Sequence, residues 1–160
     1  MFEASMPTGA SDWHAALREA ARRFADQEIT PLAAELDETE QYPAELYRRL
    51  AEAGLFGISV PEALGGAGAD VLAYALVMEE LSRGYASVAD QVGLVELLGT
   101  LLTQHGTPAQ QERYLCPLLK AERRCAYALT EAEAGADHAA LRPRVRRTAE
   151  GWVLDGAKLW

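Results

Sequence analysis

The hydrophobic pattern of this 160-residue chain changes its period near residue 122. Upstream of that point, apolar residues recur every three or four positions, which is typical of amphipathic helices. Downstream of it, apolar and polar residues alternate, which is typical of strands. The pattern therefore predicts a mainly α chain, with a helical bundle over residues 11–121 followed by the first strands of a β domain over residues 122–160.

The first half of the helical part contains two helices whose ends are marked by capping residues, proline or glycine. Apolar residues at helical spacing predict a helix from Ser11, a plausible N-cap, to about Leu36. Pro31 is expected to end or kink it, and the alternative is that TPLAAELDET at 30–39 restarts the chain as a separate helix. A second helix is expected from Pro43 to Gly54, because proline suits the first helical position and glycine suits a left-handed exit. Each helix would bury one apolar stripe.

The stretch LFGISVPEALGGAGAD, residues 55–70, has no helical or strand period and is interpreted as a packed loop. Its glycines raise the alternative of a phosphate-binding loop. However, the Lys-Ser/Thr pair of a P-loop is missing, and no clear strand–turn–helix with a dinucleotide-binding fingerprint surrounds it. A loop that merely needs backbone freedom is therefore favoured.

Three more helices are expected before the change of period. Asp70 can cap a helix that runs to about Ser82, and another helix is expected over residues 87–104. The latter contains VGLVELLGTLL, which is apolar on most faces and so indicates a central, buried helix. The sequence TPAQ at 107–110 spells a capping box with a first-turn proline, and its helix is expected to end near Cys116.

The final segment carries strand signals but little else. RRCAYALTE at 123–131 predicts one strand, and residues 141–160 predict two more, joined by an Ala-Glu-Gly turn. These late strands carry too little to make a stable sheet alone, and they end on the unpaired apolar residues Leu159 and Trp160. We therefore expect a fragment, a truncated product, or a chain that a partner completes.

The charge balance limits the classes of partner. Fifteen basic against 24 acidic residues give a net charge of −9, which argues against nucleic acid and anionic membranes, since phosphate binding relies on clustered cations. RPRVRR at 142–147 is interpreted as a solvated strand face, with an anion contact as the alternative. No apolar stretch is expected to span a membrane, and no secretory signal is apparent.

Residues that could support other chemistry do not gather in the sequence. Cys116 and Cys125 lack metal-binding spacing, so a reduced, cytoplasmic protein without a metal site is expected. The three histidines fall in separate elements and no GxSxG elbow is present, which makes a hydrolase a weak interpretation. Glu131 and Glu133 are interpreted as solvated turn carboxylates rather than an acid–base pair.

The stretch YALTEAEAGAD, residues 127–137, is the best candidate for binding. Thr130 is expected at a strand end, where backbone groups and a hydroxyl face outward, and the small residues behind it would let a ligand approach the backbone closely. A docking edge for a planar, hydrogen-bonding ring is the hypothesis, with Trp160 as an aromatic wall. Ordinary strand packing is the alternative.

Four segments, in order, resemble the acyl-CoA dehydrogenase family. YALTEAEAGAD resembles the family signature A-x-x-x-T-E-P-x-A-G-S-D, and GWVLDGAKLW resembles its G-y-x-L-N-G-x-K-x-W hairpin. ELYRRLAEAGLFGISVPEALGGAGAD and HGTPAQQERYLCPLLKAE resemble the helix-to-loop stretch and the segment before the flavin strand. The resemblance covers nearly all of residues 11–160. It implies a helical N-terminal domain, a middle β-barrel-like domain, of which only the first strands are here, and a C-terminal four-helix domain missing from this sequence.

The resemblance also implies the chemistry. Members use FAD to desaturate an acyl-CoA thioester at its α and β carbons and pass electrons to an electron-transfer flavoprotein. By position, the flavin contacts would be Tyr127, Leu129, Thr130, Gly135, Ala136 and Trp160, with Ala136 also near the acyl-CoA. The catalytic base belongs to the C-terminal half of the family, so no catalytic residue is assigned and this chain alone is expected to be inactive.

Departures from the family pattern leave alternatives open. Ala132 stands where the family has Pro, Ala136 where it has a Ser that contacts acyl-CoA, Ala157 for Thr and Ala121 for Gly. Together they suggest an unusual substrate or relaxed selection. The alternatives are a non-catalytic remnant or interaction subunit, or one chain of a heteromeric dehydrogenase. The family tends to form dimers and tetramers, so a homo-oligomer or a completing partner chain is expected.

Overall fold

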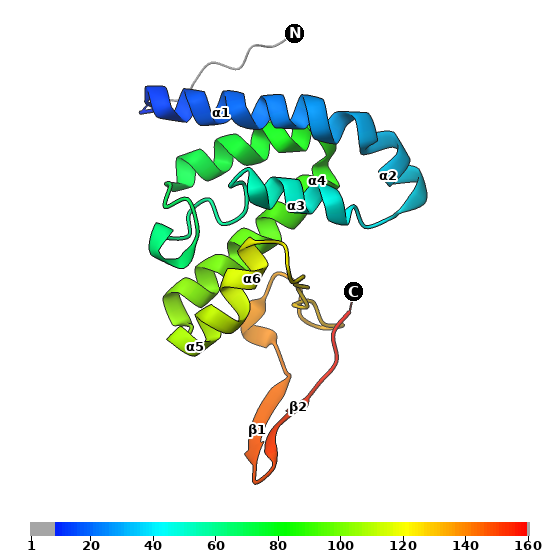
Figure 1. Cartoon of the computed structure of the whole chain (residues 1–160). Coiled ribbons are helices and arrows are strands. Elements are labelled where there is room, and N and C mark those ends of the chain that lie inside the picture. Colours follow the sequence, from blue (N-terminus) through cyan, green and yellow to red (C-terminus); the bar gives the residue numbers. More distant parts are fainter. Residues whose placement is uncertain (1–8, 160) are drawn as a thin grey trace. The chain divides into compact units, whose positions relative to one another are not determined.

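The computed structural model describes residues 9–159 of the chain, which divide into two compact units after Cys125 (Figure 1). The first unit is helical and the second holds a two-stranded sheet. The mainly α fold class predicted from the sequence is therefore confirmed. The boundary expected between residues 121 and 122 lies inside the first unit.

The chain enters the helical unit through α1 (Asp12–Phe24), with the extended Ser11 as its N-cap. A π-helical turn (Ala25–Ile29) and a 3-10 turn (Thr30–Leu32) then lead into α2 (Ala33–Thr39). Pro31 lies in the 3-10 turn, as expected for a residue that lacks a backbone N–H. The predicted first helix is therefore one helical run whose geometry changes from α to π at Ala25 and to a 3-10 turn around Pro31.

Helix α3 (Ala44–Glu52) begins one residue after Pro43 and exits through Gly54, which has a φ of +71°. The loop that follows is packed, as predicted, because Leu55, Phe56, Ile58 and Val60 are buried. A short 3-10 turn (Glu62–Leu64) closes it.

Gly66 explains why this loop needs glycine. A Cβ atom at Gly66 would lie 2.2 Å from the Val60 carbonyl oxygen, closer than any side chain can sit. Backbone therefore packs directly on backbone, which supports a structural role for the glycines over a phosphate-binding one.

Helix α4 (Val71–His105) is a single 35-residue element where two helices were predicted. Its only non-helical backbone is at Tyr85, with φ −164° and ψ 117°. The predicted gap over residues 83–86 is thus a kink. At this kink, a Cβ on Gly84 would lie 3.1 Å from the Ile29 side chain, so the segment Ala25–Ile29 packs closely against α4 here. Asp70 caps the helix as expected, accepting the Ala73 N–H at 2.8 Å.

By length and composition alone, α4 could cross a membrane, since an 18-residue window reaches a mean hydropathy of 1.2. The expectation that no apolar stretch reaches membrane-spanning length is therefore contradicted for α4 by length and composition. Core helices pass the same test. Along α4, apolar residues and the glutamates Glu80 and Glu96 are buried within the helical unit, where the helix packs on α1.

The last helical run of this unit consists of α5 (Pro108–Gln110), a π-helical turn (Gln111–Leu115) and α6 (Cys116–Leu119). The capping box is present: the Gln110 N–H donates to the Thr107 hydroxyl at 3.3 Å, and the Thr107 N–H to the Gln110 side chain at 2.8 Å. The run continues past the predicted end at Cys116, because Pro117 falls in the first turn of α6, where its missing N–H is harmless.

The core of the helical unit joins α1, α3, the 55–60 loop, α4 and α6. Its largest fully buried apolar side chains are Ile29, Leu50, Ile58, Val60, Val77, Leu81, Val88, Val92 and Leu115.

A buried ion-pair cluster adds to this core. The Glu80 carboxylate on α4 is fully buried and accepts hydrogen bonds from three arginines: Arg18 Nε at 2.7 Å, Arg22 Nη2 at 2.9 Å and Arg83 Nη1 at 2.7 Å. Burial alone would raise the pKa of Glu80, but the hydrogen bonds from the arginines outweigh it and lower that pKa to about 2.

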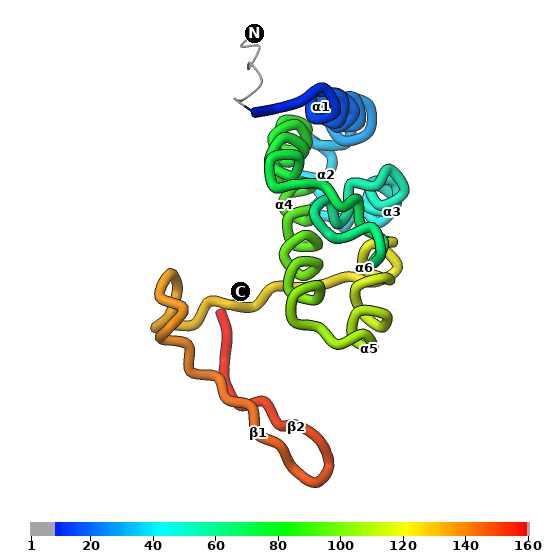
Figure 2. The backbone as a smooth tube through the Cα atoms, turned by 90° about the vertical axis from the view of Figure 1, so that its left-hand side faces the viewer, coloured from blue at the N-terminus to red at the C-terminus, as the bar shows by residue number. Residues whose placement is uncertain are grey.

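The second unit contains the predicted hairpin (Figure 2). Strand β1 (Arg144–Thr148) pairs antiparallel with β2 (Gly151–Asp155), with Arg144 opposite Asp155 and Thr148 opposite Gly151. A 3-10 turn (His138–Ala140) precedes it. The basic residues of β1 are exposed, in agreement with a solvated face.

The predicted strand over residues 123–131 is not a strand. Residues 124–130 have no regular structure, and an isolated bridge joins Glu131 to Ala134. A strand requires a neighbouring backbone to complete its hydrogen bonds. Among residues 9–159, the backbone of Thr130 receives one such bond, from the Leu159 N–H to its carbonyl at 2.8 Å.

Candidate functional site

The stretch singled out in the sequence forms an outward-facing edge in the second unit. Tyr127 is 51% exposed, Leu129 and Thr130 are partly buried, and Gly135 and Ala136 are exposed. Trp160, the expected aromatic wall, lies outside the described residues.

A tight turn ends this edge directly after Thr130. The Glu131 N–H donates to the Ala134 carbonyl at 2.8 Å, and the Ala134 N–H donates back at 3.3 Å. Ala134 is buried beneath the turn. A Cβ atom on Gly135 would meet no other atom within 4 Å, so the space above the turn is open.

The hydrogen-bonding groups of Thr130 are only partly used. Its carbonyl accepts the Leu159 N–H. Within residues 9–159, no hydrogen bond engages its N–H or its hydroxyl. A half-buried residue with an unused donor and an unused hydroxyl can bind the polar rim of a planar ring.

The Glu131 carboxylate is part of the scaffold of the edge. One oxygen accepts from Lys158 Nζ at 2.6 Å and the other from the Arg142 N–H at 3.0 Å. The hydrogen bond from Lys158 is the main reason that the pKa of Glu131 is lowered. A carboxylate held ionised in this way is a poor general acid. The expectation that Glu131 is a solvated turn carboxylate was wrong, because its side chain is only 9% exposed and is bonded at both oxygens. Glu133 is exposed and pairs with Arg142.

These features suit the rim of a planar ring that carries hydrogen-bond donors and acceptors. The edge offers backbone groups and one hydroxyl at Thr130, and it has no side chain over Gly135. Ala136 adds no polar group, so the hydroxyl that the family pattern places there is missing. Tyr127 and Leu129 flank the edge on its N-terminal side.

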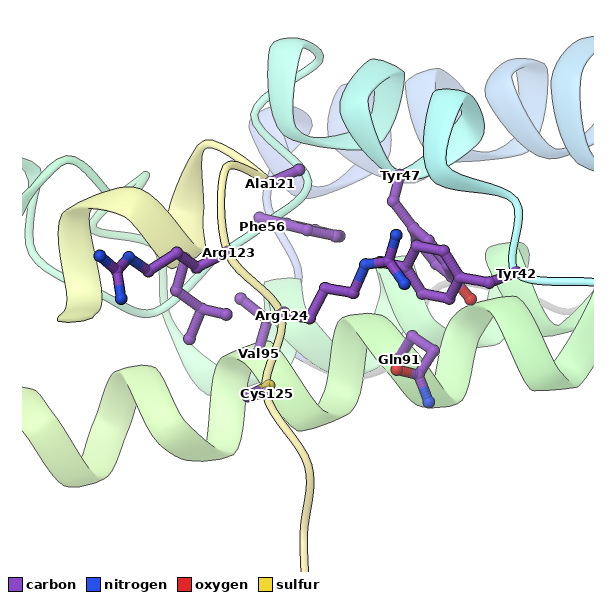
Figure 3. Close-up of a pocket in the computed structure, with 10 residues that line it drawn as sticks. Tyr42, Tyr47, Phe56, Gln91, Val95, Ala121, Arg123, Arg124 and Cys125 are labelled. Carbon is purple, nitrogen blue, oxygen red and sulfur yellow. The ribbon is translucent and has the colours of Figure 1, made fainter.

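A separate cavity of about 230 Å³ lies in the helical unit (Figure 3). Its wall combines the aromatic rings of Tyr42, Tyr47 and Phe56 with Val95 and the segment ending at Cys125. The sequence analysis missed it, because its lining comes from the segment before α3, from α3, α4 and α6, from the 55–60 loop and from the segment after α6. The periodicity of a single helix does not reveal such a convergence.

The Arg124 guanidinium lies 3.8 Å from the centroid of the Tyr42 ring, and Figure 3 shows the side chain extended toward that ring. No carboxylate of the described residues lies within ion-pair distance of Arg124. Burial raises the pKa of the Cys125 thiol, so the thiol stays protonated. The cavity is thus an apolar space with one stacked cation on its rim.

The other candidates from the sequence stay apart. His14 bonds to Ser11 and to Asp70, which ties the start of α1 to the start of α4. His105 ends α4, and His138 lies in the second unit. Both cysteines are free thiols, and within residues 9–159 no group of three or more His, Cys, Asp or Glu residues is arranged to hold a metal.

The amino-acid sequence matches known proteins over most of its length. The sequence profile described as acyl-CoA dehydrogenase, N-terminal domain, matches residues 11–122. The chain is 40% identical over 149 residues to a 3-(aryl)acrylate reductase of Clostridium sporogenes, covering 92% of this chain and 40% of that protein. It is 38% identical over 149 residues to a short-chain specific acyl-CoA dehydrogenase of Clostridium acetobutylicum, covering 90% of this chain and 38% of that protein. The chain thus spans about two fifths of the length of these curated relatives.

The fold has solved counterparts as well. The structure of an acyl-CoA dehydrogenase complexed with FAD from Bacillus anthracis matches this chain with a TM-score of 0.85 at 30% sequence identity. The match covers 98% of this chain and 27% of that one.

Proposed function

The chain belongs to the acyl-CoA dehydrogenase family, and we propose that it supplies the flavin-contacting edge of an FAD-dependent enzyme that oxidises an acyl-CoA thioester. In this proposal, residues 11–121 are the N-terminal helical domain and residues 122–160 open the middle β domain. Electrons would pass to an electron-transfer flavoprotein, and the protein would work in the cytoplasm as a homo-oligomer or with a completing chain.

The observation that carries the proposal is the open edge at Thr130. The tight turn after this residue and the unused N–H and hydroxyl leave one face of the backbone available to a planar ring. FAD, when bound, would supply the acceptor for the hydrogen removed from the β carbon. A neighbouring observation agrees: a solved structure at 30% identity contains FAD.

Individual residues have separate parts in this edge. Thr130 would bond the pyrimidine rim through its N–H and hydroxyl, while Tyr127 and Leu129 would contact the ring from the preceding backbone. Gly135 and Ala136 would lie near the ring and the thioester, where their small size avoids a clash. Trp160 is proposed as the aromatic neighbour of the flavin.

The substrate class is proposed from the relatives and from Ala136. One relative is named for 3-(aryl)acrylates and another for short chains. We therefore propose an acyl group that is short or carries an aryl ring. The alanine side chain at position 136 cannot donate a hydrogen bond to the thioester, so backbone groups or other side chains must hold it.

No described residue is proposed as the base that removes the α proton. The edge carboxylate best placed by sequence, Glu131, is held ionised by Lys158 and bonded at both oxygens. A base must be able to accept a proton near neutral pH, which a lowered pKa disfavours. The base is therefore expected from residues beyond those described, on this polypeptide or on another chain.

An FAD titration of the purified chain tests the proposal. Saturable quenching of flavin fluorescence is expected, and Thr130→Val should weaken it by about tenfold, the effect of losing one hydrogen bond. Thr148→Val is the matched control, because the Thr148 hydroxyl bonds the Gly151 carbonyl in the hairpin turn and not a ligand. Absence of saturable quenching by a chain with helical circular dichroism would contradict the proposal.

A further inference from the structure

Lys158 reaches back across the second unit to the edge that carries Thr130. We propose that Lys158 is a positioning residue, which holds residues 129–131 in the conformation that leaves the Thr130 N–H and hydroxyl open. That the edge binds a flavin rests on the function proposed above. The effect of Lys158 on the conformation of residues 129–131 can be measured without any flavin.

The contacts of Lys158 bracket Thr130. Its Nζ donates to the Leu129 carbonyl at 2.8 Å and to the Glu131 carboxylate at 2.6 Å. One acceptor precedes Thr130 and the other follows it. A lysine ammonium has three donors and can therefore bind both at once.

The next residue completes the arrangement. The Leu159 N–H donates to the Thr130 carbonyl at 2.8 Å, so Lys158 and Leu159 together engage three consecutive residues. Residues 124–130 form no strand, so these bonds replace the ladder that would otherwise fix the edge. These bonds use the Leu129 and Thr130 carbonyls and the Glu131 carboxylate as acceptors, so the N–H and the hydroxyl of Thr130 stay unused.

Lys158 is more buried than the arginines of the two exposed ion pairs in this unit. Its side chain is 25% exposed and that of Glu131 is 9% exposed. By contrast, the pairs Arg142–Glu133 and Arg146–Asp155 are more than half exposed on both sides. Solvent and salt screen exposed pairs strongly, whereas a sheltered, charge-assisted hydrogen bond retains its strength.

Loss of the ammonium would leave the edge weakly held. In Lys158→Met, one Glu131 oxygen and the Leu129 carbonyl would lose their donor, while the side-chain volume is nearly kept. Across residues 129 and 130 the remaining tie would be the bond from Leu159 to Thr130, while Glu131 would keep the Arg142 N–H and its turn bonds with Ala134. Residues 129–131 would then sample conformations in which the Thr130 N–H and hydroxyl no longer face a ligand together.

Amide hydrogen exchange of the FAD-free chain tests the holding directly. Lys158→Met is expected to speed exchange of the hydrogen-bonded Glu131, Ala134 and Leu159 N–H groups by about tenfold while the hairpin at 144–155 is unchanged. Lys158→Arg should restore most of the protection, and Arg146→Met, which removes an exposed pair, should have no effect. Equal exchange in Lys158→Met and the unaltered chain would overturn the inference, and so would a uniform increase that includes the hairpin.

FAD binding separates positioning from general stability. If Lys158 acts through Thr130, Lys158→Met should weaken FAD binding by about tenfold, and adding Thr130→Val should cost much less than a second tenfold. Fully additive losses would overturn the inference, since Lys158 would then act independently. If the unaltered chain does not bind FAD, the proposed function fails, and the exchange result still decides whether Lys158 holds the edge.

Discussion

Replacing Glu80 by glutamine is expected to remove a pH-dependent part of the stability of the helical unit. The Glu80 carboxylate is fully buried between α1 and α4 and bonded by three arginines. Burial opposes its charge, but the arginines hold its pKa at about 2. Glutamine keeps the size of the side chain and loses the charge, so it isolates the electrostatic contribution.

The magnitude follows from the difference between the folded and unfolded states. A carboxyl group with a lowered folded pKa stabilises the fold above its unfolded pKa, and the stabilisation is lost as the pH falls through the folded pKa. A change from about 4.3 in the unfolded chain to about 2 in the fold, at about 1.4 kcal/mol per pH unit, gives about 3 kcal/mol. The loss is expected between about pH 5 and pH 2.

Urea unfolding followed by circular dichroism, repeated from pH 7 to pH 2, measures this loss. The unfolding free energies of the unaltered chain and Glu80→Gln should differ most at neutral pH and converge by about 3 kcal/mol as the pH falls. Glu79→Gln is the matched control, because Glu79 is the adjacent residue, about half exposed, and pairs with Arg18 at 3.1 Å. A Glu80→Gln curve that runs parallel to that of the unaltered chain would refute the reasoning.

Two further substitutions test the packing of the helical unit. Gly66→Ala places a Cβ 2.2 Å from the Val60 carbonyl and should lower stability by about 1–3 kcal/mol in a thermal melt, whereas Gly135→Ala, in open space, should change it little. Arg124→Met removes the cation stacked on an aromatic ring at the cavity and should cost about 0.5–1 kcal/mol, with Arg113→Met, a looser stack at 5.3 Å, costing less. Equal costs within either pair would contradict the packing argument.

Features set by neighbouring residues could be predicted from the sequence. The Asp70 cap, the box at 107–110 and the left-handed exit at Gly54 each depend on side chains or backbone within four positions. The β1–β2 hairpin belongs to the same group, because a short turn fixes its register. Such features follow from local geometry and need no knowledge of the tertiary fold.

Features that depend on distant residues could not be predicted in this way. Helix α4 packs against the segment Ala25–Ile29 near Gly84, where an added Cβ would lie 3.1 Å from the Ile29 side chain, and no local pattern reveals this packing. The strand expected over 123–131 failed for the opposite reason, since a strand-forming sequence is not a strand without a partner backbone.

The candidate site also combines features set by adjacent residues with a feature set by a distant residue. The turn after Thr130 was predictable, because its small residues and the abrupt end of the apolar run are adjacent in the sequence. The support from Lys158 was not, because 29 residues separate it from Leu129. A lysine among alternating strand residues gives no sign of the carbonyl that it will bind.

The buried arginine cluster has a consequence for how the protein is made. Arg18 leaves the ribosome 62 residues before the glutamate that neutralises it, a delay of roughly 3 to 12 s at about 5–20 residues per second. During that interval Glu80 is not yet available to Arg18 and Arg22 on the nascent α1, so water is expected to hydrate these guanidinium groups. The nascent helix is therefore expected to stay undocked until the first half of α4 has emerged, so the order of synthesis sets the order of assembly.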